Sequence, residues 1–202
     1  MGSGMDKQIA LIARWHRRVV DAGARLLAVS CFDNTKFVHG HNALEDDIMS
    51  FEPWSLEFTI EVVDSLHDFC FFCRKVIERA NMRALAQTTF PHANMISHKI
   101  KQGGLDEVEV SLCQRDLWWI LGRVIHSTST FVLGGAREDL IVYPDGKTRS
   151  YADSRVFVQI ESDFDKQTGN SHVIHIPSLV HCYVSSMLAH NVREVVRSNT
   201  LS

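Results

Sequence analysis

The segment from Arg115 to His126, RDLWWILGRVIH, combines residue types that can act on a phosphodiester. It is apolar apart from Arg115, Asp116 and Arg123, and it ends in a histidine. An imidazole can move the proton of an RNA 2′-hydroxyl while a guanidinium stabilises the charge on the phosphate. The helix dipole also favours a histidine cation at a helix C-terminus. The simpler interpretation, which the sequence favours, is that His126 caps the last carbonyls and that the two tryptophans pack in the core.

Two other groups have the residue types of a metal site. His67, Cys70 and Cys73 have the spacing H-x2-C-x2-C, and imidazole and thiolates are zinc ligands. All three fall on one predicted helix, with both cysteines on its apolar stripe, so we expect buried thiols. Residues 39–47 contain two histidines and two aspartates, which we interpret as a polar loop. We therefore predict no metal site and no cofactor.

His172 and His175 belong to a predicted strand, HVIHI, in which neighbouring side chains alternate between faces. The two histidines are three residues apart, so they point to opposite faces and cannot easily share a metal. The chain has no GxxxxGK[ST], GxGxxG, HExxH or GxSxG motif. These absences argue against the commonest nucleotide-binding proteins, zinc proteases and hydrolases.

A basic cluster in the first predicted helix is a candidate nucleic-acid contact. Arg14, Arg17 and Arg18 could bind phosphates, although the net charge of −3 gives no general attraction to a polyanion. The alternative is an antiparallel pairing with the second predicted helix. Between Phe37 and Cys73 the chain has eight acidic residues and no lysine or arginine. The sequence favours this pairing, which places opposite charges beside a shared apolar seam.

Hydrophobic periodicity predicts an α+β, mainly helical fold: a bundle of about four principal helices with a small antiparallel β-sheet before the C-terminal helix. The predicted helices span residues 6–29, 53–82, 106–126 and 178–198, and the predicted strands span 130–133, 140–143, 155–161 and 172–176. Gly134 and Gly135 are predicted to connect the first two strands as a hairpin. Residues 84–104 give no clear pattern.

Composition predicts one cytoplasmic domain. The chain has 202 residues, 45% of them hydrophobic, and its five cysteines, mostly within apolar runs, indicate reduced thiols. No run of 18 apolar residues predicts a membrane-spanning helix. Residues 1–4, MGSG before a second methionine, are expected to be a cloning remnant. The domain is therefore expected to span residues 5–202, with a β insertion at about 128–176.

Two long early helices, followed by a helix that ends in Val124–Ile125–His126 before a β segment, resemble the HEPN superfamily of helical-bundle proteins. The resemblance implies a bundle fold and a homodimer in which the His-bearing helices face each other. Catalytic HEPN proteins have an arginine with four to six residues before the histidine. Here Arg123 lies three positions before His126 and Arg115 lies eleven before it, so neither matches.

We therefore predict a non-catalytic, HEPN-like protein-interaction module that forms homo-oligomers, with a protein or RNA as a further partner and no membrane contact. One alternative is a metal-independent ribonuclease that uses His126 with Arg123 or Arg115. A second alternative is a small metal-binding protein that uses His67, Cys70 and Cys73.

Overall fold

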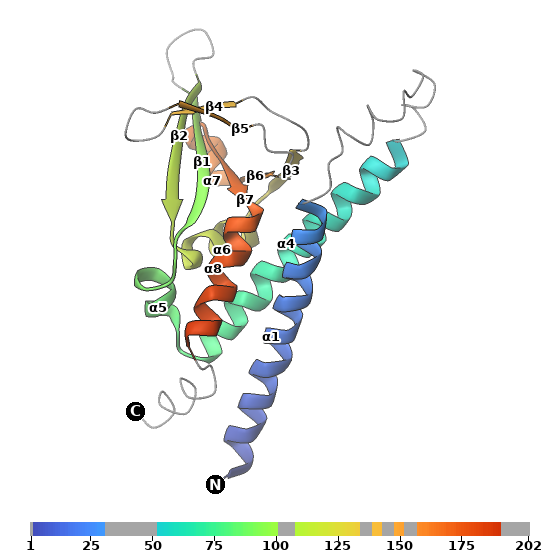
Figure 1. Ribbon diagram of the computed structural model, residues 1–202, viewed down its shortest axis with the longest axis vertical. Helices are drawn as coiled ribbons and strands as arrows, with labels where there is room; N and C mark the ends of the chain where they lie inside the picture. Colours follow the sequence, from blue (N-terminus) through green and yellow to red (C-terminus); the bar gives the residue numbers. More distant parts are fainter. Residues whose placement is uncertain are drawn as a thin grey trace.

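The computed structural model describes residues 2–30, 52–100, 108–133, 139–142, 148–151 and 157–190, and every structural statement below concerns these residues. The fold is α+β and mainly helical, as predicted. Two long helices, α1 and α4, cross beside an antiparallel sheet, and the C-terminal helix α8 packs against both layers (Figure 1). None of the described helices is long and apolar enough to span a membrane.

Helices α1 (Gly2–Ser30) and α4 (Glu52–Arg79) form the predicted antiparallel pair. Gln8 near the start of α1 donates a hydrogen bond to the carbonyl of Arg79 at the end of α4. At the other end of the seam, Arg25 lies 3.5 Å from Glu61 and 3.8 Å from Asp68. These ion pairs are half-exposed and contribute only about 0–1 kcal/mol each. Burial of the apolar seam therefore stabilises the pair, and the charges help to select the partner.

The main sheet has five strands in the order β2-β1-β7-β6-β3, and every neighbouring pair is antiparallel. Its strands are β1 (Ala93–Ile100), β2 (Val108–Arg115), β3 (Ser129–Leu133), β6 (Phe157–Glu161) and β7 (Asn170–His175). A separate two-stranded sheet pairs β4 (Asp139–Val142) with β5 (Thr148–Tyr151).

One face of the main sheet packs on the helices. Met95 pairs with Ile174, and both side chains are buried. Two residues further along, Ser97 pairs with His172. Because side chains alternate along a strand, Ser97 and His172 point to the same face as Met95 and Ile174. The sheet register therefore places a polar pair at the margin of the apolar core.

Four shorter helices complete the described fold: α5 (Arg83–Thr88), α6 (Leu117–Ile125), α7 (Asp163–Thr168) and α8 (Ile176–Ala189). The side chain of Asp116 caps α6 by accepting a hydrogen bond from the amide of Trp119 at 2.9 Å. Ser162 and Asp165 form a capping box at the start of α7, which ends at Gly169 with φ 66°. Both helices thus begin at a capping side chain, and α7 also ends at a glycine that can adopt a positive φ.

The predicted helix over 106–126 is wrong in its first half, because Val108–Arg115 forms strand β2 and the helix begins only at Leu117. The segment VEVSL also alternates with period two, and pairing with β1 selects this period over the helical one. Residues 84–104, which gave no pattern, contain most of α5 and strand β1.

The predicted β insertion at about 128–176 holds only part of the main sheet, since β1 and β2 precede it. The predicted hairpin across Gly134 and Gly135 is also wrong: β3 pairs with β6, and β4 pairs with β5. Between the third and fourth predicted strands, where no helix was predicted, the structure has helix α7. Helix α1 begins at Gly2, within the expected cloning remnant. The two glycines themselves, the loop around residues 39–47 and the end of the predicted last helix lie outside the described residues.

Candidate functional site

The structure brings two of the three predicted catalytic residues together. Arg115, at the end of β2, and Arg123, in α6, place their guanidinium carbons 5.3 and 5.0 Å from the ring centre of Trp119. His126 is the exposed C-cap of α6, and its amide donates to the carbonyl of Gly122. Its ring makes no hydrogen bond or ion pair with another described residue. The histidine that contacts Trp119, and on which the charges of both arginines act, is instead His172.

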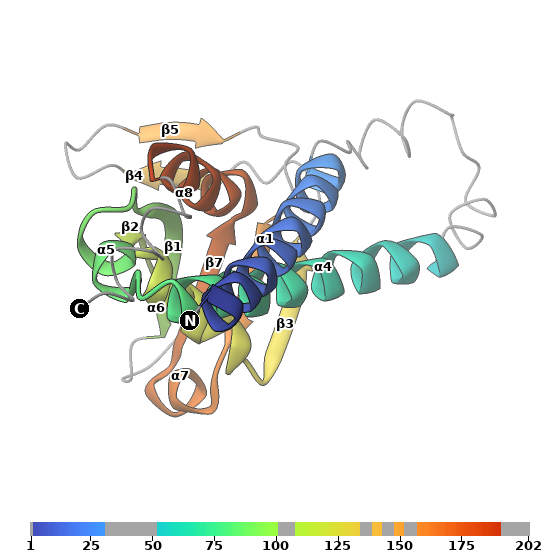
Figure 2. The same cartoon turned by 90° about the horizontal axis from the view of Figure 1, so that it is seen from below.

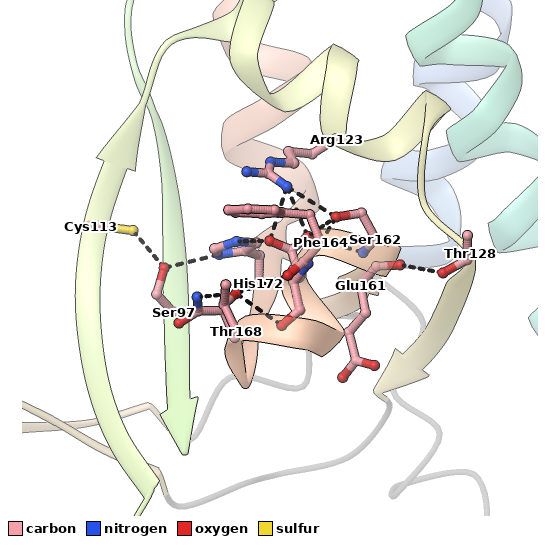
Figure 3. A network of polar contacts seen from close by, with 11 residues as sticks. Ser97, Cys113, Arg123, Thr128, Glu161, Ser162, Phe164, Thr168 and His172 are labelled. Atoms are coloured by element: carbon pink, nitrogen blue, oxygen red, sulfur yellow. Dashed lines mark hydrogen bonds and ion pairs between the residues drawn. The ribbon is translucent and has the colours of Figure 1, made fainter. Parts of the chain in front are cut away.

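Arg123 holds Asp165 in a largely buried ion pair. Its Nη1 donates to both carboxylate oxygens of Asp165, at 2.9 and 3.1 Å, and to Oγ of Ser162 at 3.0 Å. The Asp165 side chain is 2% exposed and that of Arg123 is 25% exposed. Arg123 also lies over the ring of Phe164, as Figure 3 shows. The ion pair therefore ties α7 to α6.

His172 continues this network towards Ser97 and Cys113 (Figure 3). Its Nε2 lies 3.4 Å from Oδ1 of Asp165, and its Nδ1 lies 3.1 Å from Oγ of Ser97. Oγ of Ser97 in turn lies 3.3 Å from Sγ of Cys113. One tautomer satisfies all these contacts: Nε2–H donates to the carboxylate, and Nδ1 accepts the hydroxyl proton of Ser97.

Burial and the positive charges of two arginines keep the ring of His172 neutral. Burial has the largest effect and lowers the pKa of His172. Asp165 raises the pKa, whereas the positive charges of Arg123 and Arg115 lower it. The net result is a pKa below the ordinary value. For Asp165, burial raises the pKa, but hydrogen bonds from Ser162 and the charges of Arg123 and His172 outweigh it, so the pKa is lowered. At neutral pH the network thus holds an ionised carboxylate beside a neutral imidazole.

The second tryptophan of α6 has its own pair of arginines. The guanidinium carbons of Arg74 (α4) and Arg83 (α5) lie 4.8 and 4.9 Å from the ring centre of Trp118. Arg74 also donates to Glu78 at 3.0 Å. We call this set the arginine–tryptophan face; its members are Arg74, Arg83, Arg115, Trp118, Trp119 and Arg123.

The face exists because α6 is short and amphipathic. Its apolar residues Leu117, Ile120, Leu121 and Val124 are buried in the core, which turns both tryptophans towards the edge of the molecule. The helix lies beside the C-terminal part of α4 and next to α5 (Figure 2). Arginines from three separate elements therefore converge on one helix. No sequence pattern indicates Arg74 and Arg83 as site residues, because their contacts depend on this packing.

The arginines predicted to bind nucleic acid lie elsewhere, on α1. Arg18 lies over the ring of Phe72 at 4.8 Å. Arg14 and Arg17 are exposed. They remain an independent candidate contact, and none of them belongs to the arginine–tryptophan face.

The cysteines of the H-x2-C-x2-C segment are buried thiols, as predicted. Cys70 and Cys73 are both 0% exposed, and burial raises their pKa values. Within the part of the chain that the structure describes, no group of three histidine, cysteine or acidic side chains is placed to hold a metal ion. The candidate in residues 39–47 lies outside that part.

Ser97, Asp165 and His172 were not predicted as site residues. The only local signal was the SDFD sequence at 162–165, which is a capping-box pattern. Comparison of the chain with protein-family models, with curated proteins and with solved structures finds no match.

Proposed function

We propose that this protein binds single-stranded RNA through the arginine–tryptophan face. The observation that carries the proposal is the placement of four guanidinium groups over two adjacent indole rings. Stacking on an aromatic ring holds a guanidinium group in place and leaves its N–H edge free. Such an edge matches the oxygens of a phosphate in a bidentate manner.

Two of the four arginines are the main candidates for phosphate contact. Arg74 and Arg123 already donate to Glu78 and Asp165. Among the described residues, Arg83 and Arg115 have no carboxylate partner, and both are exposed. An RNA backbone would supply the missing anions. Guanidinium planes also suit the stacking of unpaired bases, which favours a single strand over a duplex.

The double variant Arg83→Ala/Arg115→Ala is expected to bind RNA about tenfold more weakly than the parent, because two charge-assisted contacts are lost. The measurement is fluorescence anisotropy with a labelled oligouridine of about 20 nucleotides, a length that exceeds one typical single-strand site. Each phosphate contact contributes about 0.7 to the slope of log affinity against log salt. The slope should therefore fall by about 1.4 in the variant.

The matched control is Arg14→Ala/Arg17→Ala, which removes the same charge from α1. It should bind as the parent does. An equal loss in both variants would show a general charge effect, and a loss in the α1 variant alone would place the contact on α1. A denaturing gel of the same RNA after incubation in EDTA separates binding from cleavage. Cleavage that is lost in His126→Ala would support the ribonuclease alternative instead.

Self-association, which the HEPN resemblance implies, is a second proposed activity, and exposed apolar side chains on two packed helices favour it. We call the four residues the strip; they are Val20 and Leu27 of α1 and Val184 and Leu188 of α8, with Leu188 83% exposed. The two helices pack together, and Nδ1 of His16 lies 2.8 Å from Oη of Tyr183. The strip is not on the His126-bearing helix that the resemblance places at a dimer interface.

Leu188→Glu is expected to convert an oligomer into a monomer, because a charge at the interface leaves a desolvated carboxylate without a partner. Light scattering coupled to size exclusion measures this directly. His181→Glu adds the same charge at an exposed position of α8 and should leave the mass unchanged. A monomeric parent at micromolar concentration would contradict this second proposal and leave the RNA proposal unaffected.

A further inference from the structure

Three side chains from elements far apart in the sequence meet in the order that nucleophilic catalysis requires. Ser97 lies on β1, His172 on β7 and Asp165 on α7. The sheet register pairs Ser97 with His172, so their side chains share a face. The capping box of α7 fixes Asp165 beneath the imidazole. Nucleophile, base and orienting acid are therefore each held by backbone hydrogen bonds of a separate element.

The hydrogen-bond directions suit proton transfer away from Ser97. The hydroxyl faces Nδ1 at 3.1 Å, and Nε2 faces the carboxylate at 3.4 Å. Hydrogen bonds between a nucleophile, its base and the orienting acid usually span about 2.6–3.2 Å, and they are often longer when no substrate is bound. The first distance falls within this range and the second lies just beyond it. Trp119 packs edge-on against the imidazole, with ring centres 5.1 Å apart, and fixes the plane of the ring.

The solvent exposure of the three side chains increases from the acid to the nucleophile, which fits proton transfer away from Ser97. Asp165 and His172 are buried, whereas Ser97 is partly exposed. Of the three residues, Ser97 is therefore the one nearest to solvent, while water is largely excluded from the carboxylate. Arg115 is exposed beside Trp119, and its charge acts on His172. We expect it to bind an anionic group of a substrate, because Arg123 is already paired with Asp165.

We infer that Ser97 is the nucleophile of a phosphoryl-transfer site, with His172 as its general base and Asp165 as the positioning residue. In this step the Ser97 proton passes to Nδ1 of His172, and Oγ forms a bond to phosphorus. The bond from phosphorus to the leaving group breaks, and the leaving group takes the proton from the imidazolium. Water then attacks the phosphoserine, His172 accepts a proton from that water, and Oγ leaves and is reprotonated. The substrate class is a phosphate ester whose anionic oxygens lie near Arg115.

The charged and titratable groups that face His172 predict how the step depends on pH. Asp165 faces it from α7, Arg123 from α6 and Arg115 from the end of β2, with Ser97 and Cys113 on the neighbouring strands. Burial and the two arginines hold the pKa of His172 below its ordinary value of 6.5. At pH 6.5 more than half of the base is therefore neutral, and the midpoint of its loss of function lies at lower pH.

The test is covalent labelling of the full chain with a fluorophosphonate probe, followed by intact mass and peptide mapping. The Ser97 hydroxyl attacks phosphorus, fluoride leaves, and the adduct is stable. We expect one adduct, on Ser97, that is absent in Ser97→Ala. In His172→Gln the labelling rate should fall about 100-fold, which is the usual contribution of a general base. Ser127→Ala removes a hydroxyl that bonds only outside this network, and its labelling should equal that of the parent.

A second measurement does not depend on how well the variants fold. The labelling rate of the parent chain should reach a plateau at neutral pH and should fall at lower pH with a midpoint below 6.5. Absence of an adduct on Ser97 would overturn the inference, and so would a rate that is unchanged in a folded His172→Gln variant. A rate that does not fall at acidic pH while the chain stays folded would also overturn it, because a neutral imidazole is then not required.

Discussion

Replacement of Asp165 by asparagine is expected to lower the free energy of unfolding by about 3 kcal/mol. The side chain keeps its size but loses the charge that Arg123 contacts through both oxygens. Arg123 is then left three-quarters buried without a counter-ion. Loss of one partner of a buried ion pair costs more than the pair itself contributes, because the remaining charge stays desolvated. Helix α7 should separate from α6 first.

The same pair predicts how stability depends on pH. The pKa of Asp165 is lowered in the folded protein, so its contribution is fully present above the ordinary value of 3.8 and is lost as pH falls through the folded pKa. The pKa of His172 is also lowered, so stability already begins to fall below pH 6.5. In Asp165→Asn the loss below pH 3.8 should become smaller, because this carboxylate no longer titrates.

Urea denaturation at neutral and acidic pH measures both effects. Asp163→Asn is the matched control, since Asp163 is an exposed acid in the first turn of the same helix. Its replacement should change the free energy of unfolding by no more than about 0.5 kcal/mol. If Asp165→Asn unfolds at the same urea concentration as the parent, the ion pair does not hold α7 in place.

The second large effect is expected at Gly23, where α1 passes between α4 and α8. A Cβ atom at this position would lie 3.2 Å from the Phe69 ring and 3.3 Å from Cγ1 of Val180. Gly23→Leu must therefore push α1 away from both helices, at a cost of about 3 kcal/mol. Gly23→Ala should be nearly neutral, because its tight contacts offset a gain in helix propensity of about 1 kcal/mol.

Thermal and urea denaturation of the two variants, with Ala24→Leu as control, test this packing. Ala24 is the exposed neighbour of Gly23, so leucine there should change stability by less than about 0.5 kcal/mol. Equal stability of Gly23→Leu and Ala24→Leu would contradict the close approach of α1 to Phe69 and Val180.

The spacing of apolar residues along the sequence was enough to predict the helices that bury a continuous apolar stripe. The seam of α1 and α4 follows from three- and four-residue spacing of buried residues such as Val19, Leu26 and Leu66, and from opposite charges on its flanks. The strands β3, β6 and β7 alternate clearly enough to be found with boundaries shifted by one to two residues. The inert, buried state of Cys70 and Cys73 also follows from their place on the apolar stripe.

Segments with two competing periods could not be assigned from the sequence alone. Residues 108–115 fit a helix that continues into α6, and they also fit a strand. The strand is formed because β1, which the sequence did not reveal, supplies hydrogen-bond partners along its whole length. Strand pairing is decided by a partner elsewhere in the chain, so a local pattern cannot select it.

In the candidate site, too, some features follow from the sequence and others only from tertiary packing. The sequence by itself determined that Arg115, Arg123 and His126 stand at the two ends of a short apolar segment. Only the tertiary structure decided that both arginines lie over Trp119, where their charges act on His172, and that His126 is at the surface. It also joined Ser97 to Asp165, 68 positions apart in the sequence, through one imidazole. Contacts of this kind depend on sheet register and on the docking of α7, which are properties of the folded chain and have no local signal.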